Sequence, residues 1–223
     1  MREVVLDTET TGLDPAEGHR IVEVGCLELV NHLPTGRSFQ AYVNPEREMP
    51  EDAQAVHGIT GEQLAGMPKF GEIVEPLLGF LGEAPLVIHN ADFDLAFLNA
   101  ELKRLGRAAL PRERAIDTLA LARRKFPGAQ ASLDALCRRF EIDASQRDFH
   151  GALVDCDLLS KVYLELIGGR QARLELASGL ASSASGGAGE RPFRAPRPHA
   201  PSDDELAAHA RMVARLKKAL WQA

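Results

Sequence analysis

The sequence predicts a mixed α/β domain that is followed by a linker and a C-terminal helix. Strand patterns come first along the chain, helical patterns dominate later, and strand-to-helix steps occur between residues 85 and 125. After residue 170 the composition changes to Ser, Gly, Ala, Pro and Arg, with almost no large apolar residue. We therefore expect a sheet flanked by helices over residues 1–170, a flexible segment over 171–201 and a helix within 202–223.

Several segments have the apolar composition or the alternation that is typical of strands. They are residues 2–7, 20–30, 37–43, 85–89 and 114–117. The residues NHLPTG at 31–36 have the chemistry of a turn, so the second and third strands are expected to form an antiparallel hairpin.

Other segments have helical periodicity, with start and stop signals at their ends. They are residues 52–57, a short helix from Thr60, and residues 69–81, 93–106, 118–126, 132–140 and 151–167. Thr60 and Gln63 fit a capping box, and Ser132 is a candidate N-cap. Gly106 is expected to end its helix.

The composition restricts the class of protein. The net charge of −6 argues against a domain that wraps duplex DNA by bulk electrostatics, but not against one that grips a few nucleotides through metal ions. The three cysteines, Cys26, Cys137 and Cys156, lie in apolar stretches and are expected to be buried and reduced. No signal peptide or transmembrane run is visible, which predicts a cytoplasmic protein without membrane contact.

The first acidic motif is Asp7-Thr-Glu9, at the end of the first predicted strand. Residues two apart in a strand point to the same face, so these carboxylates repel each other unless they share a cation. Hard oxygen ligands of this kind suit Mg²⁺ or Mn²⁺. Taken alone, the pair is more typical of solvated acids at the end of a strand. The turn that follows, Thr10-Thr11-Gly12, offers amides and hydroxyls that can contact a nucleotide phosphate or sugar.

Two further acidic motifs, HNADFD at 89–94 and HGALVD at 150–155, each open a predicted helix. His150 lies at or just before its helix and Asp155 lies on it. A histidine on a loop beside a rigid carboxylate is the arrangement that a water-activating base requires.

The three motifs, in this order and at these distances, resemble the DEDD exonuclease superfamily in its histidine variant. The resemblance implies a ribonuclease H-like fold. VHGIT at 56–60, DTLALARRKFPG at 117–128 and SLDALCRRFEID at 132–143 are similar to the family of proofreading (epsilon) subunits of bacterial DNA polymerase III. This resemblance covers residues 1–170 almost continuously, and the C-terminal segment also resembles the tail of that family.

Carried over position by position, the resemblance implies that Asp7, Glu9, Asp94 and Asp155 bind two divalent cations, Mg²⁺ or Mn²⁺, and that His150 is the general base. Two neighbouring acids compete for these roles. The family pattern places the ligand directly after Phe, which favours Asp94 over Asp92, and the five-residue step from His150 favours Asp155 over Asp157. Asp117 and Asp134 are interpreted as helix caps or as groups that support the ligands.

The resemblance also implies substrate contacts with the single-stranded 3′ end of DNA. Val56 and His57 belong to the segment that contacts the terminal nucleotide in the family, although His57 can also be a loop histidine without a role. His89 and Asn90 are interpreted either as structural partners of the site or as DNA contacts. The basic run 123–125 can face DNA or form a solvated helix face.

Two segments after the domain are candidate partner sites. Gln171, Leu174 and Leu176 resemble a sliding-clamp-binding peptide, but an extension of the preceding helix explains them equally well. The C-terminal helix, with Trp221, is expected to dock on the catalytic (alpha) subunit of the polymerase, because an isolated helix of this length is marginal in water.

The predicted activity is therefore removal of mispaired nucleotides from DNA primer termini by a 3′→5′ exonuclease. A first alternative is an RNA 3′ exonuclease of the same superfamily, which the catalytic residues do not distinguish. A second is a non-catalytic scaffold that stabilises a polymerase, which the presence of all four carboxylates and His150 argues against.

Overall fold

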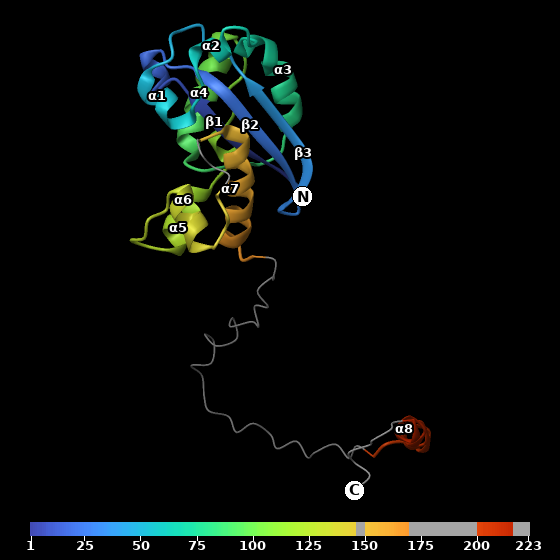
Figure 1. Ribbon diagram of the computed structural model, residues 1–223. Coiled ribbons are helices and arrows are strands. Elements are labelled where there is room, and N and C mark those ends of the chain that lie inside the picture. Colours follow the sequence, from blue (N-terminus) through green and yellow to red (C-terminus); the bar gives the residue numbers. More distant parts are fainter. Residues whose placement is uncertain (146–149, 170–199, 216–223) are drawn as a thin grey trace, which may run out of the picture. The chain divides into compact units, whose positions relative to one another are not determined.

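Figure 1 shows the computed structural model, which describes residues 1–145, 150–169 and 200–215. The chain divides into two compact units, residues 1–174 and residues 175–223. The clamp-like residues Gln171, Leu174 and Leu176 lie outside the described residues, and so does all but the end of the expected flexible segment.

The first unit is built on a mixed sheet of five strands in the order β3-β2-β1-β4-β5. The strands are β1 (Arg2–Thr10), β2 (Ile21–Val30), β3 (Leu33–Tyr42), β4 (Leu86–Ile88) and β5 (Ala115–Asp117). The first three are antiparallel neighbours, whereas β4 pairs parallel to β1 and β5 pairs parallel to β4. All five predicted strands are present, and the predicted α/β class is confirmed.

The hairpin between β2 and β3 is tighter than the sequence predicts. Val30 pairs with Leu33, so only Asn31 and His32 form the turn, and both have positive φ angles of 52° and 67°. A two-residue turn with this geometry matches the twist of the flanking strands. The prediction that residues 31–36 form the turn was therefore wrong, because residues 33–36 belong to β3.

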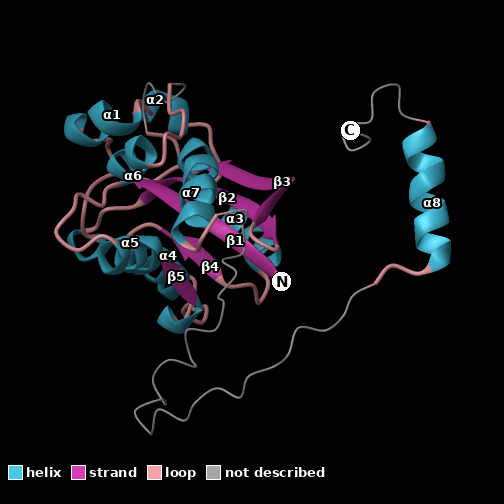
Figure 2. Cartoon of the chain, turned by 90° about the horizontal axis from the view of Figure 1, so that it is seen from below, coloured by secondary structure: helices cyan, strands magenta, loops and turns pink. Residues whose placement is uncertain are grey.

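Helices surround the sheet and follow the predicted order (Figures 1 and 2). They are α1 (Glu51–His57), α2 (Gly61–Leu64), α3 (Phe70–Leu81), α4 (Ala91–Arg104), α5 (Thr118–Lys125), α6 (Leu133–Arg139) and α7 (Ala152–Leu166), with short 3₁₀ turns η1 (Pro15–Glu17) and η2 (Arg112–Arg114). The predicted capping box of Thr60 and Gln63 and the Ser132 cap are both present. Gly106 follows α4 with a positive φ of 65°.

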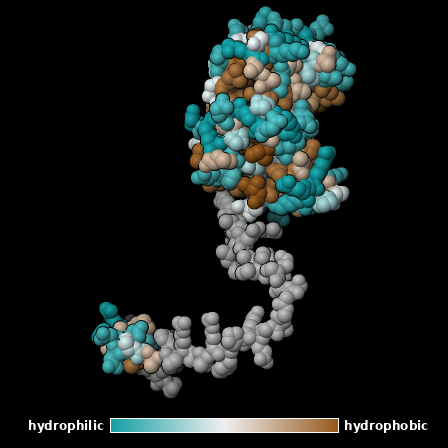
Figure 3. Space-filling model, turned by 180° about the vertical axis from the view of Figure 1, so that it is seen from behind, coloured by the Kyte–Doolittle hydropathy of each residue, from teal (hydrophilic) through white to brown (hydrophobic). Residues whose placement is uncertain are grey.

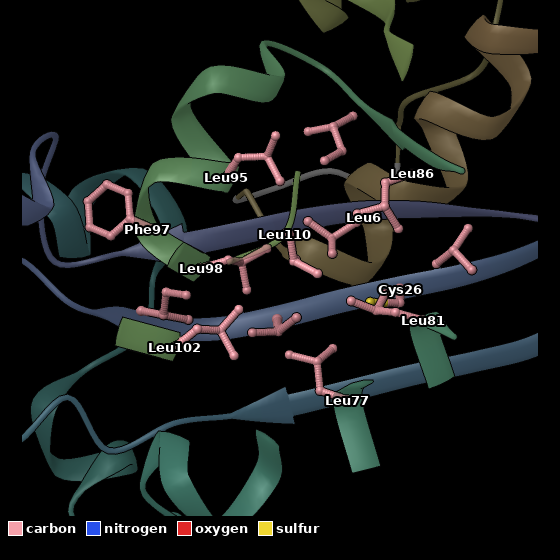
Figure 4. Packing of buried hydrophobic residues seen from close by; sticks show 14 of the residues in the cluster. Leu6, Cys26, Leu77, Leu81, Leu86, Leu95, Phe97, Leu98, Leu102 and Leu110 are labelled. Carbon is pink, nitrogen blue, oxygen red and sulfur yellow. The ribbon is translucent and has the colours of Figure 1, made fainter. Parts of the chain in front are cut away.

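Two hydrophobic cores lie on the two faces of the sheet. Figure 4 shows the first core, in which leucines of α3 and α4 pack against Leu6, Cys26 and Leu86 of the strands. The second core joins Val5 and Leu27 to α5, α6 and α7. All three cysteines are buried, as predicted. The central strands β1, β2 and β4 therefore present alternate residues to different helices on the two faces of the sheet.

The surface is mostly hydrophilic on the face shown in Figure 3, in line with a charged fraction of 26 %. No helix within the described residues is both long enough and apolar enough to cross a membrane. In the second unit, α8 (Asp203–Ala214) begins after the N-cap Ser202, whose side chain forms a capping box with Glu205. Trp221 lies outside the described residues.

A buried ion pair ties the start of β2 to α4. The Arg20 guanidinium donates to both carboxylate oxygens of Glu101, at 2.5 and 2.9 Å. Glu101 is 2 % exposed and also accepts from Arg104 at 3.1 Å. Glu101 raises the pKa of Arg20 more than burial lowers it, so Arg20 remains charged. The pair fixes α4, and with it the residues that α4 presents at its beginning.

We predict that Arg20→Ala lowers the free energy of unfolding by about 3 kcal/mol, because it leaves a buried carboxylate with only one cationic partner. Urea denaturation of the full chain measures this loss. The matched control is Arg107→Ala, which removes an ion pair to Glu75 in which both side chains are about half exposed. This variant should lose less than about 1 kcal/mol. Equal losses for the two variants would contradict a structural role of the Arg20 pair.

Candidate active site

The last part of β1 presents Asp7 and Glu9 side by side on one face of the sheet. They share this face with Val5, which packs in the core beneath α7. Across the β1–β2 ladder, Asp7 lies opposite Gly25 and Glu9 lies opposite Glu23. The register shifts directly after Glu9, so the regular ladder ends here. Both acidic side chains are thus directed to the edge at which α7 begins.

Helix α7 places the third motif beside Glu9. Asp155 lies in the first turn and is 4 % exposed, whereas His150 precedes the N-cap Gly151 and is exposed. His150 Nδ1 lies 3.3 Å from Asp155 Oδ2. One potential ligand atom from each of Glu9, His150 and Asp155 lies within 4.8 Å of the other two. Residues separated by about 140 positions are thus close enough to share one ion.

Asp94 approaches the same edge from the other side of the sheet. It lies in the first turn of α4, and β4, which leads to α4, runs parallel to β1. The Thr8 hydroxyl, between Asp7 and Glu9, donates to Asp94 Oδ1 at 2.8 Å. Burial raises the pKa of Asp94 from 3.8 to about 7, against the lowering effect of the Thr8 hydrogen bond. Without metal, Asp94 is therefore partly protonated near neutral pH.

The competing acids have different surroundings. Asp92 is exposed and bonds to Arg112 Nε at 2.5 Å, and Asp157 is exposed and bonds to Lys161 Nζ at 2.7 Å. Asp117 is the N-cap of α5, as predicted, and accepts from the backbone N–H of Leu119 at 2.9 Å.

One cavity opens on the α7 side of these residues. It has a volume of about 430 Å³, and we call it the acidic cavity. Its lining residues are Asp7, His89, Leu119, Arg123, Ser132, Leu133, Asp134, His150 and Asp155. Burial lowers the pKa of His89, whose Nδ1 lies 2.9 Å from the Thr118 hydroxyl. His89 is thus both a structural partner and part of the cavity wall, so both interpretations of it remain open.

A second cavity, of about 480 Å³, lies between β1 and α1. We call it the threonine cavity. It is lined by Thr8, Glu9, Thr10, Thr11, Gly12, Leu13, Glu17, His19, Pro50, Asp52, Ala53, Val56, His57 and Phe93. The backbone N–H of His150 donates to the Val56 carbonyl at 3.2 Å. His150 is therefore tied to the wall of this cavity while its side chain lines the acidic cavity.

The hydroxyls of the Thr10-Thr11-Gly12 turn hold the turn itself. Thr10 Oγ1 donates to the Gly12 carbonyl at 2.6 Å. Thr11 is fully buried. Its Oγ1 accepts from the Arg20 backbone N–H at 3.0 Å, and the same oxygen lies 3.2 Å from His19 Nδ1. A side chain on Gly12 would meet the His19 ring at 2.3 Å. The turn thus forms a fixed wall of the threonine cavity.

His57, at the end of α1, is buried. Its Nδ1 accepts from the backbone N–H of Ile59 at 3.0 Å, which places the proton of the neutral ring on Nε2. Burial lowers the pKa of His57. Asn90 adopts a left-handed conformation, with φ 68°, at the start of α4, and its backbone N–H donates to Asp117 Oδ1 at 3.3 Å.

The residues of the basic run 123–125 have different surroundings. Arg123 lines the acidic cavity, whereas Lys125 Nζ donates to the carbonyls of Glu165 and Leu166 at the end of α7. Phe93 is partly buried, packs against the first core and also lines the threonine cavity. Glu23 was not singled out, although a charged residue inside an apolar strand is a signal in itself.

The fold and the acidic edge of the sheet are those of a nuclease, and comparison with known proteins agrees. The model of the exonuclease family, RNase_T, matches residues 4–163. The nuclease domain of 3′hExo, described as a DEDDh family member bound to rAMP, superposes with a TM-score of 0.65 and 21 % identity, covering 74 % of this chain and 91 % of that one. This similarity confirms the ribonuclease H-like fold.

The chain belongs to the exonuclease family and, within it, to the epsilon subunits of DNA polymerase III. It is 54 % identical to the epsilon subunit of Rickettsia felis over 179 residues, which are 79 % of this chain and 78 % of that protein. It is 45 % identical to the epsilon subunit of Escherichia coli over 177 residues, which are 76 % of this chain and 72 % of that protein.

The donor atoms at the edge of the sheet fit the divalent metal ions that the DEDD exonuclease superfamily implies. Carboxylate oxygens are hard ligands, and those of Glu9 and Asp155 converge with His150 within 4.8 Å. Asp94 must release its proton before it can bind a cation. We therefore expect metal affinity to rise with pH around neutrality.

We predict that, in EDTA, Asp94 contributes a fall in stability as pH rises between about 4 and about 7. In this window the folded chain holds a proton that the unfolded chain has released. Urea denaturation at several pH values should show a less negative slope for Asp94→Asn than for the unmodified chain. Asp92→Asn, two residues earlier and exposed, is the control and should keep the slope. An unchanged slope in Asp94→Asn would show that its carboxyl group is already ionised.

Proposed function

We propose that this protein is a 3′→5′ exonuclease that removes mispaired nucleotides from DNA primer termini, as the proofreading subunit of the replicative DNA polymerase. The observation that carries this proposal is the meeting of Glu9, Asp155 and His150 at one point in a chain of the epsilon family. Such a subunit works in the cytoplasm, where bacterial DNA is replicated.

Asp7, Glu9, Asp94 and Asp155 are proposed to hold two divalent cations, Mg²⁺ or Mn²⁺. Bound there, such ions would neutralise charge on the scissile phosphate and favour ionisation of the attacking water. Asp92 and Asp157 are less suited to be metal ligands, because each is exposed and forms an ion pair with a basic side chain, Arg112 or Lys161.

His150 is proposed to accept the proton of the attacking water. Its side chain is solvent-accessible and lies beside Asp155 and Glu9, the proposed metal ligands, where a metal-bound water would be within reach. The oxygen of this water forms a bond to phosphorus, and the bond to the 3′ oxygen of the preceding nucleotide breaks. The 3′ oxygen leaves and takes up a proton, and the terminal nucleotide departs as a 5′-monophosphate.

The threonine cavity is proposed to bind the terminal nucleoside of the 3′ end. It adjoins Glu9, and Leu13, Val56 and Phe93 give it apolar walls suited to a base. His57 Nε2–H and the backbone of Thr10-Thr11-Gly12 are the proposed polar contacts, with Asn90 on the neighbouring helix start.

Hydrolysis should depend on metal, on Asp155 and on His150. Asp155→Ala and EDTA should abolish cleavage of a DNA primer, and His150→Gln should lower kcat by about 10²–10⁴-fold, as expected for loss of a general base. Gel assays on matched and mismatched primer termini, with Asp157→Ala as an active control, measure this. Preferred cleavage of RNA would favour the alternative RNA exonuclease, and metal-independent or absent hydrolysis would favour a scaffold.

Two C-terminal segments are proposed to bind replication partners. Residues 202–223 are proposed to dock on the alpha subunit of DNA polymerase III, and Gln171, Leu174 and Leu176 on the sliding clamp. Deleting 202–223 should abolish co-purification with the alpha subunit and leave hydrolysis intact. In a titration, Gln171→Ala with Leu174→Ala should weaken clamp binding. Retained binding in either case would contradict the corresponding assignment.

A further inference from the structure

Strand β2 carries a buried glutamate that the proposed reaction does not use. Glu23 is 1 % exposed and lies directly opposite Glu9 in the β1–β2 ladder. Like charges at directly opposed positions destabilise an antiparallel pair, and burial of a carboxylate adds to the cost. A carboxylate at this position therefore requires specific hydrogen-bond donors.

Both oxygens of Glu23 have such donors. Oε2 accepts from the backbone N–H of Ala152 at 3.1 Å, and Oε1 accepts from Gln40 Nε2 at 2.7 Å. Ala152 is the first residue of α7, and its N-cap, Gly151, has no side chain that could cap the helix. The first N–H groups of a helix have no partner within the helix. Glu23 thus caps α7 from a strand 129 residues away in the sequence.

The neighbouring position on the same face of β2 confirms how closely α7 approaches. A side-chain carbon on Gly25 would lie 2.4 Å from the Ala152 carbonyl carbon, so the first turn of α7 rests directly on the β2 backbone. Cys156 Sγ also donates to the Gly25 carbonyl at 3.3 Å. Asp7 pairs with Gly25 across the ladder, and Glu9 pairs with Glu23 on the same face. Each of these acidic residues of β1 thus lies opposite a β2 residue that contacts the start of α7.

We propose that Glu23 is a positioning residue, whose hydrogen bond to the Ala152 N–H places Asp155 and His150 against Glu9. The backbone N–H of Asp155 donates to the Gly151 carbonyl at 2.8 Å, so Ala152 and Asp155 belong to one rigid turn. A displacement of that turn moves Asp155 away from Glu9 and shifts Gly151, to which His150 is directly joined. This inference rests on the proposed function, because the residues that Glu23 positions are the proposed ligand and base.

The test compares Glu23→Ala with Glu23→Gln in the full chain. Mn²⁺ binding is measured by isothermal titration calorimetry, and kcat and KM are measured on a single-stranded DNA oligomer. Glu23→Ala should weaken Mn²⁺ binding about tenfold and lower kcat about 10–100-fold, with KM little changed, as for other residues that support metal ligands. Glu23→Gln should remain within about threefold of the unmodified chain, because its amide oxygen can still accept from Ala152 while the Gln40 amide turns over.

Glu28→Ala is the matched control, because Glu28 is also a buried glutamate of β2 but pairs with Arg2 and Arg37 instead of α7. It should lower the thermal unfolding midpoint without changing Mn²⁺ affinity. Glu23→Ala with unchanged Mn²⁺ affinity and kcat, or Glu23→Gln as impaired as Glu23→Ala, would overturn the proposal. If the unmodified chain hydrolyses no DNA, the proposed function fails, whereas the Mn²⁺ titrations still decide the role of Glu23.

Discussion

The packing of α7 across β1 and β2 is the contact on which the candidate site depends. Both ends of the helix are held by buried carboxylates of the sheet: Glu23 accepts from Ala152 at the start, and Glu3 accepts from the Tyr163 hydroxyl at 2.8 Å near the end. Because Gly25 has no side chain, the backbone of β2 and the first turn of α7 at Ala152 are in direct contact. Because α7 is fixed in this way, Asp155 lies beside Glu9 although the two residues are far apart in sequence.

This packing gathers negative groups at one edge of the sheet, which is unfavourable without a cation. The cost is visible in the groups behind the site: burial raises the pKa of Cys156, and the charges of Asp7, Asp94 and Asp155 raise it further. Burial also raises the pKa of Asp94 to about 7. The site therefore gathers carboxyl groups that are largely buried, and divalent cations bound there would stabilise their charged forms.

The α4 side of the site depends on a different anchor. The Arg20–Glu101 ion pair fixes the body of α4, and the Thr8 hydroxyl reaches Asp94 at its first turn. Asp94 and Asp155 therefore approach the end of β1 from opposite faces of the sheet and are held by separate contacts. His150, whose backbone N–H bonds to the Val56 carbonyl, links this edge to the threonine cavity. The proposed sites of hydrolysis and of 3′-end binding thus share one connected wall.

The sequence by itself determined the local elements. Alternation, periodicity and capping residues such as Thr60 and Ser132 predicted the strands and helices, because these signals act over a few residues. The sequence also carried the three acidic motifs. It could not limit the β2–β3 turn to Asn31 and His32, because cross-strand pairing decided where β3 begins.

Only the tertiary structure decided which polar residues meet. Asp92 and Asp94 lie in the same helical turn, but only the Asp94 side chain is buried. There it accepts a hydrogen bond from the Thr8 hydroxyl, whereas Asp92 is exposed and pairs with Arg112. In the sequence, Glu23 is a single charged residue in an apolar strand. Its role follows from the packing of α7, because the backbone N–H of Ala152 at the start of that helix requires an acceptor. Burial and hydrogen-bond partners come from segments distant in sequence, so the chemical role of these residues follows from packing and not from local pattern.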